Sequence, residues 1–163
     1  MNAHIKFITD ATLAGLAKWL RLLGFDTIVY GSAADRPMMR QAQSQERILL
    51  TRRRDMRERQ FAGDLFLLPA ASTGQQLNLV IRKYSLKINS REMYKICLIC
   101  NQRLHPVGRE EVRDLVPAFV FENCEQYQQC DHCGKIYWLG SHIQNALQFL
   151  EKNNIKIIKN EEM

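Results

Sequence analysis

The sequence lacks any long apolar run, and no stretch of its 163 residues approaches the roughly 18 consecutive apolar residues of a membrane-spanning helix. The opening MNAHIKFITD also lacks the basic segment and apolar core of a secretory signal peptide. Internal repeats and low-complexity segments are absent as well, which excludes a repeat architecture. We therefore expect a cytoplasmic protein that does not enter a membrane.

The sequence shows no sign of a disulfide framework, because the five cysteines belong to a chain that we expect to be cytoplasmic. Four of them form two CxxC pairs, which are separated by 29 residues. Two such pairs can supply four thiolates to one tetrahedral zinc ion, and four protein ligands make a closed, structural site. A redox dithiol is disfavoured because such a motif would not occur twice. The predicted zinc ligands are Cys97, Cys100, Cys130 and Cys133, and we expect Cys124 to be a small apolar core residue.

The acidic residues are few in the first part of the chain. The protein has 23 Lys and Arg against 17 Asp and Glu, a formal charge of +6. Residues 1–96 carry a net +8 and residues 97–163 a net −2. An anionic partner bound by the first part is the natural expectation, although solvated helix faces can give an excess of this size.

Strand-like and helix-like segments alternate through the first half. The runs IKFI, TIVY, RILLT and DLFLL have the composition of strands, and amphipathic or capped segments follow them. Alternation of this kind favours a parallel sheet with helices on both faces. The fold class predicted from the pattern is α/β.

Three aspartates follow successive predicted strands, namely Asp10, Asp35 and Asp55. Because the carboxyl ends of parallel strands meet at one edge of the sheet, these carboxylates can converge there. Oxygen ligands of this kind suit Mg²⁺ or Mn²⁺, and a metal-activated water could then attack a phosphodiester. The structural alternative is that each aspartate caps a helix, and composition does not decide between the two.

The second half has a different pattern, with little apolar periodicity in SLKINSREMY. We expect a domain at 1–90, a small zinc-binding unit with a C-terminal helix at 91–150, and a polar tail at 151–163. VPAFVFEN and KIYWL are predicted to be strands, with CDHCG as the turn between them. The final helix has its apolar face at Ile143, Ala146, Leu147 and Leu150.

Several of these segments together resemble a known family. FITDATLAGLAKWLRLLGFDT, Asp35, ILLTRRRDM and the terminal CDHCGKIYWLGSH are similar to the bacterial and archaeal family related to the C-terminal RNase domain of the Mut-seven exonuclease. The similarity covers about residues 4–145. It implies a PIN-like parallel sheet flanked by helices, followed by a small zinc ribbon, with metal-dependent cleavage of RNA as the activity.

The resemblance also implies site residues. Asp10, Asp35 and Asp55 match the family's acids, which would serve as catalytic residues and hold Mg or Mn. The sequence departs from the family at Arg53, which stands where an aspartate is expected. A guanidinium in a divalent-metal site would repel the metal. The residues expected near the RNA backbone are Lys18, Arg21, Arg52 and Arg54.

The sequence is consistent with two main functions. The first is a PIN-like, Mg- or Mn-dependent ribonuclease whose activity depends on Asp55. The second is an RNA-binding protein that keeps the PIN-like fold and zinc ribbon but is catalytically weakened by Arg53. A protein-interaction adaptor built on the ribbon is a weaker third possibility.

Overall fold

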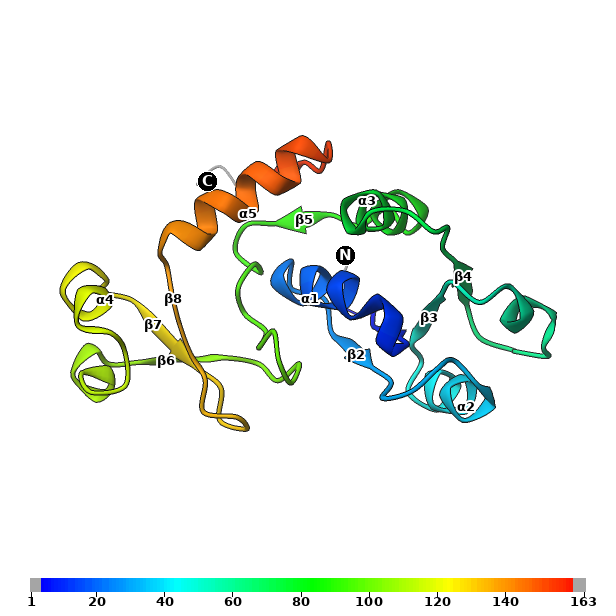
Figure 1. Ribbon diagram of the computed structural model, residues 1–163, viewed down its shortest axis with the longest axis horizontal. Helices are drawn as coiled ribbons and strands as arrows, with labels where there is room; N and C mark the ends of the chain where they lie inside the picture. Colours follow the sequence, from blue (N-terminus) through cyan, green and yellow to red (C-terminus); the bar gives the residue numbers. More distant parts are fainter. Residues whose placement is uncertain (1–3, 160–163) are drawn as a thin grey trace.

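The computed structural model describes residues 4–159, so the first three residues of the opening segment and residues 160–163 of the predicted tail lie outside it. Its centre is a four-stranded sheet of order β2-β1-β3-β4, in which every pair is parallel. The strands are β1 (Phe7–Thr9), β2 (Thr27–Val29), β3 (Ile48–Thr51) and β4 (Leu65–Leu67). The predicted parallel α/β fold is confirmed (Figure 1).

Helices connect the strands, and polar side chains cap them. They are α1 (Ala14–Leu22), preceded by a 3-10 turn at Ala11–Leu13, α2 (Arg36–Ser44) and α3 (Thr73–Lys83). Asp10 caps the first turn, Asp35 caps α2, and Ser72 forms a capping box with Gln75. The third crossover is short and contains a 3-10 helix, η2 (Arg54–Glu58).

Each face of the sheet carries its own apolar core. On one face, the fully buried Leu16 and Leu20 of α1 pack in a cluster with Phe7 and Leu77. The other core contains Ile8, Met38 and Leu49, all with no exposed surface. Alternate residues of β1 therefore face opposite cores, as expected for a central strand buried on both sides.

The second half begins with a three-stranded antiparallel sheet. It contains β6 (His105–Val107), β7 (Tyr127–Gln129) and β8 (Ile136–Trp138) in the order β6-β7-β8. A 3-10 helix, η3 (Arg109–Val112), follows β6. The CDHCG turn joins β7 to β8, and KIYWL contains β8 as predicted.

The prediction of a strand in VPAFVFEN is wrong, because this segment contains helix α4 (Ala118–Asn123). Its valine and aromatic residues have strand propensity, but Pro117 stands at the N-cap and predisposes the next residues to a helical turn. Phe121 then packs beneath the guanidinium groups of Arg109 and Arg113 rather than in a sheet. The strand that pairs with β8 comes a few residues later, in β7.

The C-terminal helix α5 (Ser141–Lys152) returns to the first half of the chain (Figure 1). Phe149 stacks on Trp19 of α1 with ring centroids 4.0 Å apart, and Leu150 joins the core that contains Phe7. Trp19 is thus packed against the core. The division into domains stays a prediction, but this helix contributes to the core of the parallel domain.

Part of the predicted polar tail is also structured. Ile155 is buried with the same core, and β9 (Ile157–Ile158) forms a parallel pair with β5 (Ile88–Asn89). The last described residues therefore pair with β5, in the segment that connects the parallel sheet to the antiparallel sheet.

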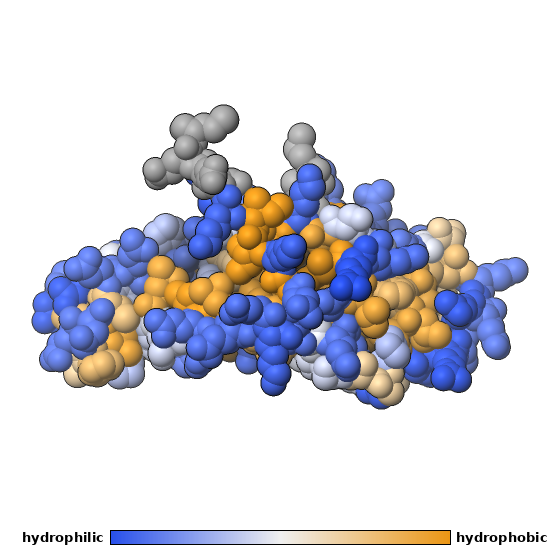
Figure 2. Space-filling model, turned by 90° about the horizontal axis from the view of Figure 1, so that it is seen from above, coloured by the Kyte–Doolittle hydropathy of each residue, from blue (hydrophilic) through white to orange (hydrophobic). Residues whose placement is uncertain are grey.

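One face of the molecule is covered by α3 and α5, and apolar side chains gather near its middle (Figure 2). Leu79 of α3 and Leu147 of α5 are both more than one-third exposed. Within residues 4–159, no helix combines the length and apolar character needed to cross a membrane.

Candidate metal centre and acidic edge

The four cysteines of the two CxxC pairs come together. Their sulfur atoms all lie within 4.8 Å of one another, with Sγ–Sγ distances of 3.7 Å for Cys97 and Cys133 and 3.2 Å for Cys100 and Cys130. A tetrahedral zinc ion with Zn–S bonds of about 2.3 Å requires sulfurs about 3.8 Å apart. The cluster therefore fits a metal ion such as zinc, and Cys124 lies outside it.

The two knuckles share one backbone design. The N–H group of Asn101 donates to the Cys97 carbonyl, and that of Gly134 donates to the Cys130 carbonyl. Asn101 and Gly134 adopt φ values of 63° and 74°, which turn the chain so that both sulfurs of each pair face inward. The sequence spacing predicts this arrangement, and four protein ligands leave no position for a substrate.

Tyr137 lies directly beside the cysteines. Its hydroxyl is 3.2 Å from Cys97 Sγ and accepts a hydrogen bond from the Leu98 N–H group. Burial raises the pKa of the Cys97 thiol, but hydrogen bonds from Tyr137 and from backbone N–H groups lower it to about 6. Burial and the neighbouring Cys130 raise the pKa of Cys100 to about 12. Tyr137 is thus a hydrogen-bonding partner of the cysteine cluster, and no motif in the sequence pointed to it.

Arg21 joins the first knuckle to the parallel domain. It is only 7% exposed, and it donates to the carbonyls of Thr27, Leu98 and Ile99 at 2.7, 2.8 and 3.1 Å. Burial lowers the pKa of Arg21. This guanidinium is therefore fixed inside the protein, away from the solvent that an RNA-binding residue would face.

Asp26 makes a second connection at the same place. It accepts two hydrogen bonds from Arg47, at 2.7 and 3.2 Å, and one from Asn101. Partial burial acts to raise the pKa of Asp26, but the bonds from Arg47 and Asn101 hold it below its usual value. Asp26 precedes β2, so the ribbon is attached near the amino edge of the parallel sheet.

Asp10 lies at the opposite, carboxyl edge, directly after β1. It is 2% exposed. One carboxylate oxygen accepts hydrogen bonds from the Thr12 N–H and hydroxyl groups, and the other accepts from the Thr51 hydroxyl at 3.2 Å. Thr51 ends β3, next to β1 in the sheet, and its role as a partner of Asp10 was not apparent in the sequence.

Asp35 belongs to the loop that follows β2, and it combines two roles. One oxygen caps α2 by accepting from the Met38 N–H group at 2.9 Å, and the other accepts from the Tyr30 hydroxyl at 3.3 Å. The capping alternative raised by the sequence thus describes part of what Asp10 and Asp35 do. Capping by one oxygen leaves lone pairs on the carboxylate for another ligand.

Asp55 is held by two arginines. Arg53 donates to both of its oxygens, at 3.0 and 2.7 Å, and Arg59 adds a contact at 3.2 Å. These hydrogen bonds lower the pKa of Asp55, and the bond from Arg53 has the largest effect. Arg53 also donates to the Ala34 carbonyl at 2.6 Å, beside Asp35. Its guanidinium therefore connects the loops after β2 and β3, on either side of the end of β1.

The three aspartates consequently do not form one ligand group. In the described part of the chain, the four cysteines are the one group of three or more His, Cys, Asp or Glu side chains placed to hold a metal ion. Asp10 and Asp35 have the donor chemistry for a divalent cation, whereas Asp55 is engaged by Arg53. The remaining basic residues expected near RNA, Lys18, Arg52 and Arg54, are exposed.

These features define a class of protein in which a parallel α/β domain is joined to a ribbon with four cysteines placed to hold a metal ion. The family model described as the Mut7-C RNAse domain matches residues 5–150, and the chain belongs to this family. The resemblance seen in the sequence is thereby confirmed. Comparison with curated proteins yields no match.

Proposed function

We propose that the protein cleaves RNA phosphodiester bonds at the carboxyl edge of its parallel sheet, with Asp10 at the centre of the site. The observation that carries this proposal is the environment of Asp10. Among residues 4–159, its hydrogen-bond donors are Thr12 and Thr51, and no Lys or Arg forms an ion pair with it. A buried carboxylate is costly unless a positive charge compensates it. Asp10 is thus suited to a bound cation.

Mg²⁺ or Mn²⁺ is the cation that best matches these donors, because both ions prefer carboxylate oxygens. Asp10 and Asp35 would hold it, and Asp55 would join them on leaving Arg53 and Arg59. A bound metal supplies an activated water and neutralises phosphate charge. The pair between Arg53 and Asp55 is nearly half exposed on both sides, so it adds little stability and can be exchanged.

RNA is the proposed substrate because the family is one of RNase domains and the first half of the chain is strongly basic. Arg52 and Arg54 flank Arg53 at the carboxyl edge, and Lys18 lies on the exposed side of α1. Their side chains would bind the phosphate backbone and so position it, without reading the base sequence. Arg21 has no part in this proposal because it is buried.

A second function is favoured by the contact of Arg53 with Asp55. If this contact persists when RNA binds, the third carboxylate stays unavailable, and the protein binds RNA with weakened catalysis. RNA affinity would then fall steeply as salt is raised, since phosphate contacts release counterions.

The deciding experiment is an RNA cleavage assay on the zinc-loaded protein with and without Mn²⁺. We expect Mn²⁺-dependent cleavage of single-stranded RNA that Asp10→Asn abolishes. Asparagine is as good an N-cap as aspartate, so this variant should remain folded. Asp114→Asn, at an exposed aspartate of the ribbon half, is the matched control. RNA binding without Mn²⁺-dependent turnover would favour the second function instead.

A further inference from the structure

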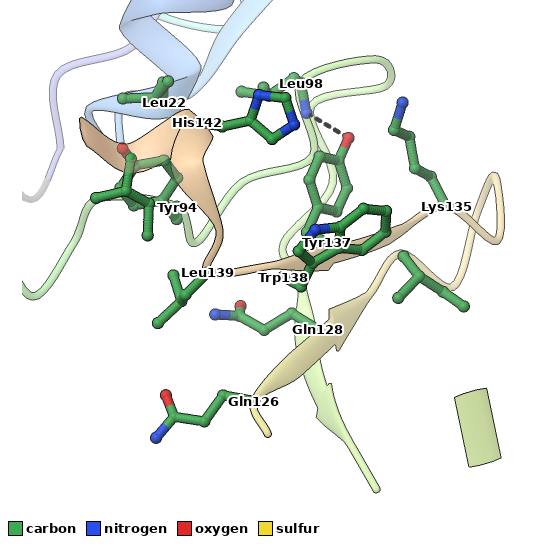
Figure 3. Close-up of a pocket in the computed structure, with 12 residues that line it drawn as sticks. Leu22, Tyr94, Leu98, Gln126, Gln128, Lys135, Tyr137, Trp138, Leu139 and His142 are labelled. Carbon is green, nitrogen blue, oxygen red and sulfur yellow. Dashed lines mark hydrogen bonds between the residues drawn. The ribbon is translucent and has the colours of Figure 1, made fainter. Parts of the chain in front are cut away.

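A pocket of about 320 Å³ lies between the ribbon and the parallel domain (Figure 3). Leu22 from the end of α1, Tyr94 and Leu98 form one side of it. Tyr137 and Trp138 of β8 form another, and α5 contributes its first turn. Its volume is at the lower end of the range for small-ligand sites, about 300–1,000 Å³.

The lining combines aromatic rings with a few polar groups. Tyr94, Tyr137 and Trp138 provide flat apolar surfaces, and Gln126 and Gln128 project from the adjoining segment of β7 (Figure 3). None of the twelve lining residues is an aspartate or a glutamate. The ionisable groups other than tyrosine are instead Lys135 and His142, and both are exposed. The positively charged groups therefore suit an anionic ligand, and the aromatic rings suit a ligand that carries a flat ring.

We infer that this pocket binds one unpaired base of single-stranded RNA, an inference that rests on RNA being the substrate, as proposed above. The aromatic rings offer the base a stacking surface, which serves any base because each has a π-face. The side-chain amides of Gln126 and Gln128 can both donate to and accept from the polar edge of the base. Lys135 binds the adjoining phosphate from the rim.

The position of Lys135 supports this assignment. Its ammonium group lies 5.8 Å from the centre of the Tyr137 ring, so the charge already sits beside the aromatic surface. A cation next to a stacking platform matches a nucleotide, in which a phosphate and a base are covalently linked. An apolar peptide would use the rings but would make no use of Lys135 or the two glutamines, whereas a nucleotide contacts all three kinds of group.

The pocket and the acidic edge lie at opposite ends of α1. Asp10 precedes this helix and Leu22 ends it. Three residues of 3-10 turn, at about 2 Å each, and nine of α-helix, at about 1.5 Å each, place them roughly 20 Å apart. A single RNA strand must therefore extend over several nucleotides to occupy both sites. Binding at the second site is then intramolecular, so affinity for long RNA should exceed that for short RNA.

The test uses zinc-loaded, full-length Asp10→Asn protein, which should not degrade RNA. A single-stranded RNA containing 5-iodouridine is cross-linked by ultraviolet light, and the modified peptides are mapped by mass spectrometry. We expect adducts at Tyr94, Trp138 or His142.

In a parallel binding experiment, Gln128→Ala and Lys135→Ala, each combined with Asp10→Asn, should weaken binding of a long RNA at least about fivefold. Lys156→Ala, at an exposed lysine outside the pocket, is the matched control.

Three other outcomes of these experiments would overturn the inference. Unchanged RNA affinity in both pocket variants, with adducts confined to the carboxyl edge, would exclude this pocket but leave RNA cleavage by the wild-type protein in place. Binding of an apolar peptide here without any RNA adduct would identify a protein-docking site instead. Absence of both RNA binding and RNA cleavage would overturn the proposed function as well. Because cross-linking needs no substitution in the pocket, a misfolded variant cannot obscure the result.

Discussion

The guanidinium of Arg53 binds the carboxylate of Asp55 and the carbonyl of Ala34 at once. It thereby spans the loops after β3 and β2, whose strands flank the Asp10 strand in the sheet. Arg53, where the resemblance to the family leads us to expect an aspartate, is thus also the residue that engages the third carboxylate.

Arg53→Asp should remove this connection between the two loops and introduce a carboxylate that can serve as an additional metal ligand. The substitution removes both Arg53 hydrogen bonds to Asp55, leaving only the longer contact with Arg59, and it replaces a repelling cation with an oxygen donor. We therefore expect Mn²⁺-dependent cleavage to increase about tenfold or more in kcat/KM. Arg57→Asp is the control, since it makes the same change of charge at an exposed arginine of the same loop that has no part in the proposed site. Equal effects of the two substitutions would assign the result to net charge rather than to the Arg53–Asp55 contact.

The four-cysteine cluster should hold one structural zinc ion per chain. Cys100→Ser is expected to lose the bound metal and to lower the melting temperature markedly, because metal-binding energy in such sites is folding energy. Zinc content by atomic absorption and thermal unfolding are the measurements. Cys124→Ser should keep its zinc, because that thiol lies outside the cluster. Full zinc content in Cys100→Ser would contradict the assignment.

Replacement of Arg21 should affect stability far more than RNA affinity. Arg21→Ala leaves three carbonyl groups without their donor, and we expect a loss of about 3 kcal/mol in the free energy of unfolding. For a chain of this size, each kcal/mol lowers the melting temperature by about 2–4 °C. Lys18→Ala, on the exposed side of the same helix, should change stability by no more than about 0.5 kcal/mol. A stable Arg21→Ala protein with reduced RNA affinity would reverse this interpretation.

Asp26 should make the stability dependent on pH. Its pKa is lower in the folded protein than in the unfolded chain, where it is near 3.9. A depressed pKa contributes stability above the unfolded value, and this contribution disappears as the pH falls through the folded value. Asp26→Asn should therefore lower the melting temperature at pH 7, by only a few degrees because the side chain is 41% exposed. The difference from wild type should shrink below about pH 4. A difference that stays constant from pH 7 to pH 3 would argue against this ionic contribution.

The features that the sequence predicts well are those with a local physical cause. Asp35 followed by Pro37 specifies the start of α2, and the CxxC spacing specifies the two knuckles, since each depends on a few adjacent residues. The alternation of apolar segments is equally informative about the parallel sheet. These elements are confirmed in the structure.

The features that the sequence could not provide depend on contacts between distant segments. Arg21 has the composition and helical position of a surface residue, but residues 98 and 99 of the first knuckle cover it and accept its hydrogen bonds. VPAFVFEN has strand propensity, yet β7 occupies the place beside β8. The hydrogen bond from Thr51 to Asp10 likewise joins residues 41 positions apart.

The pairing of β5 with β9 bears on where the folding unit ends. The family match stops at residue 150, but Ile155 fills part of the Phe7 core and β9 secures the segment that leads to Cys97. A protein shortened at the limit of family similarity would therefore leave a hole beside Leu150 and an unpaired strand edge at Ile88. The last described residues are part of the protein's core architecture, and deletion studies should preserve the chain through residue 159.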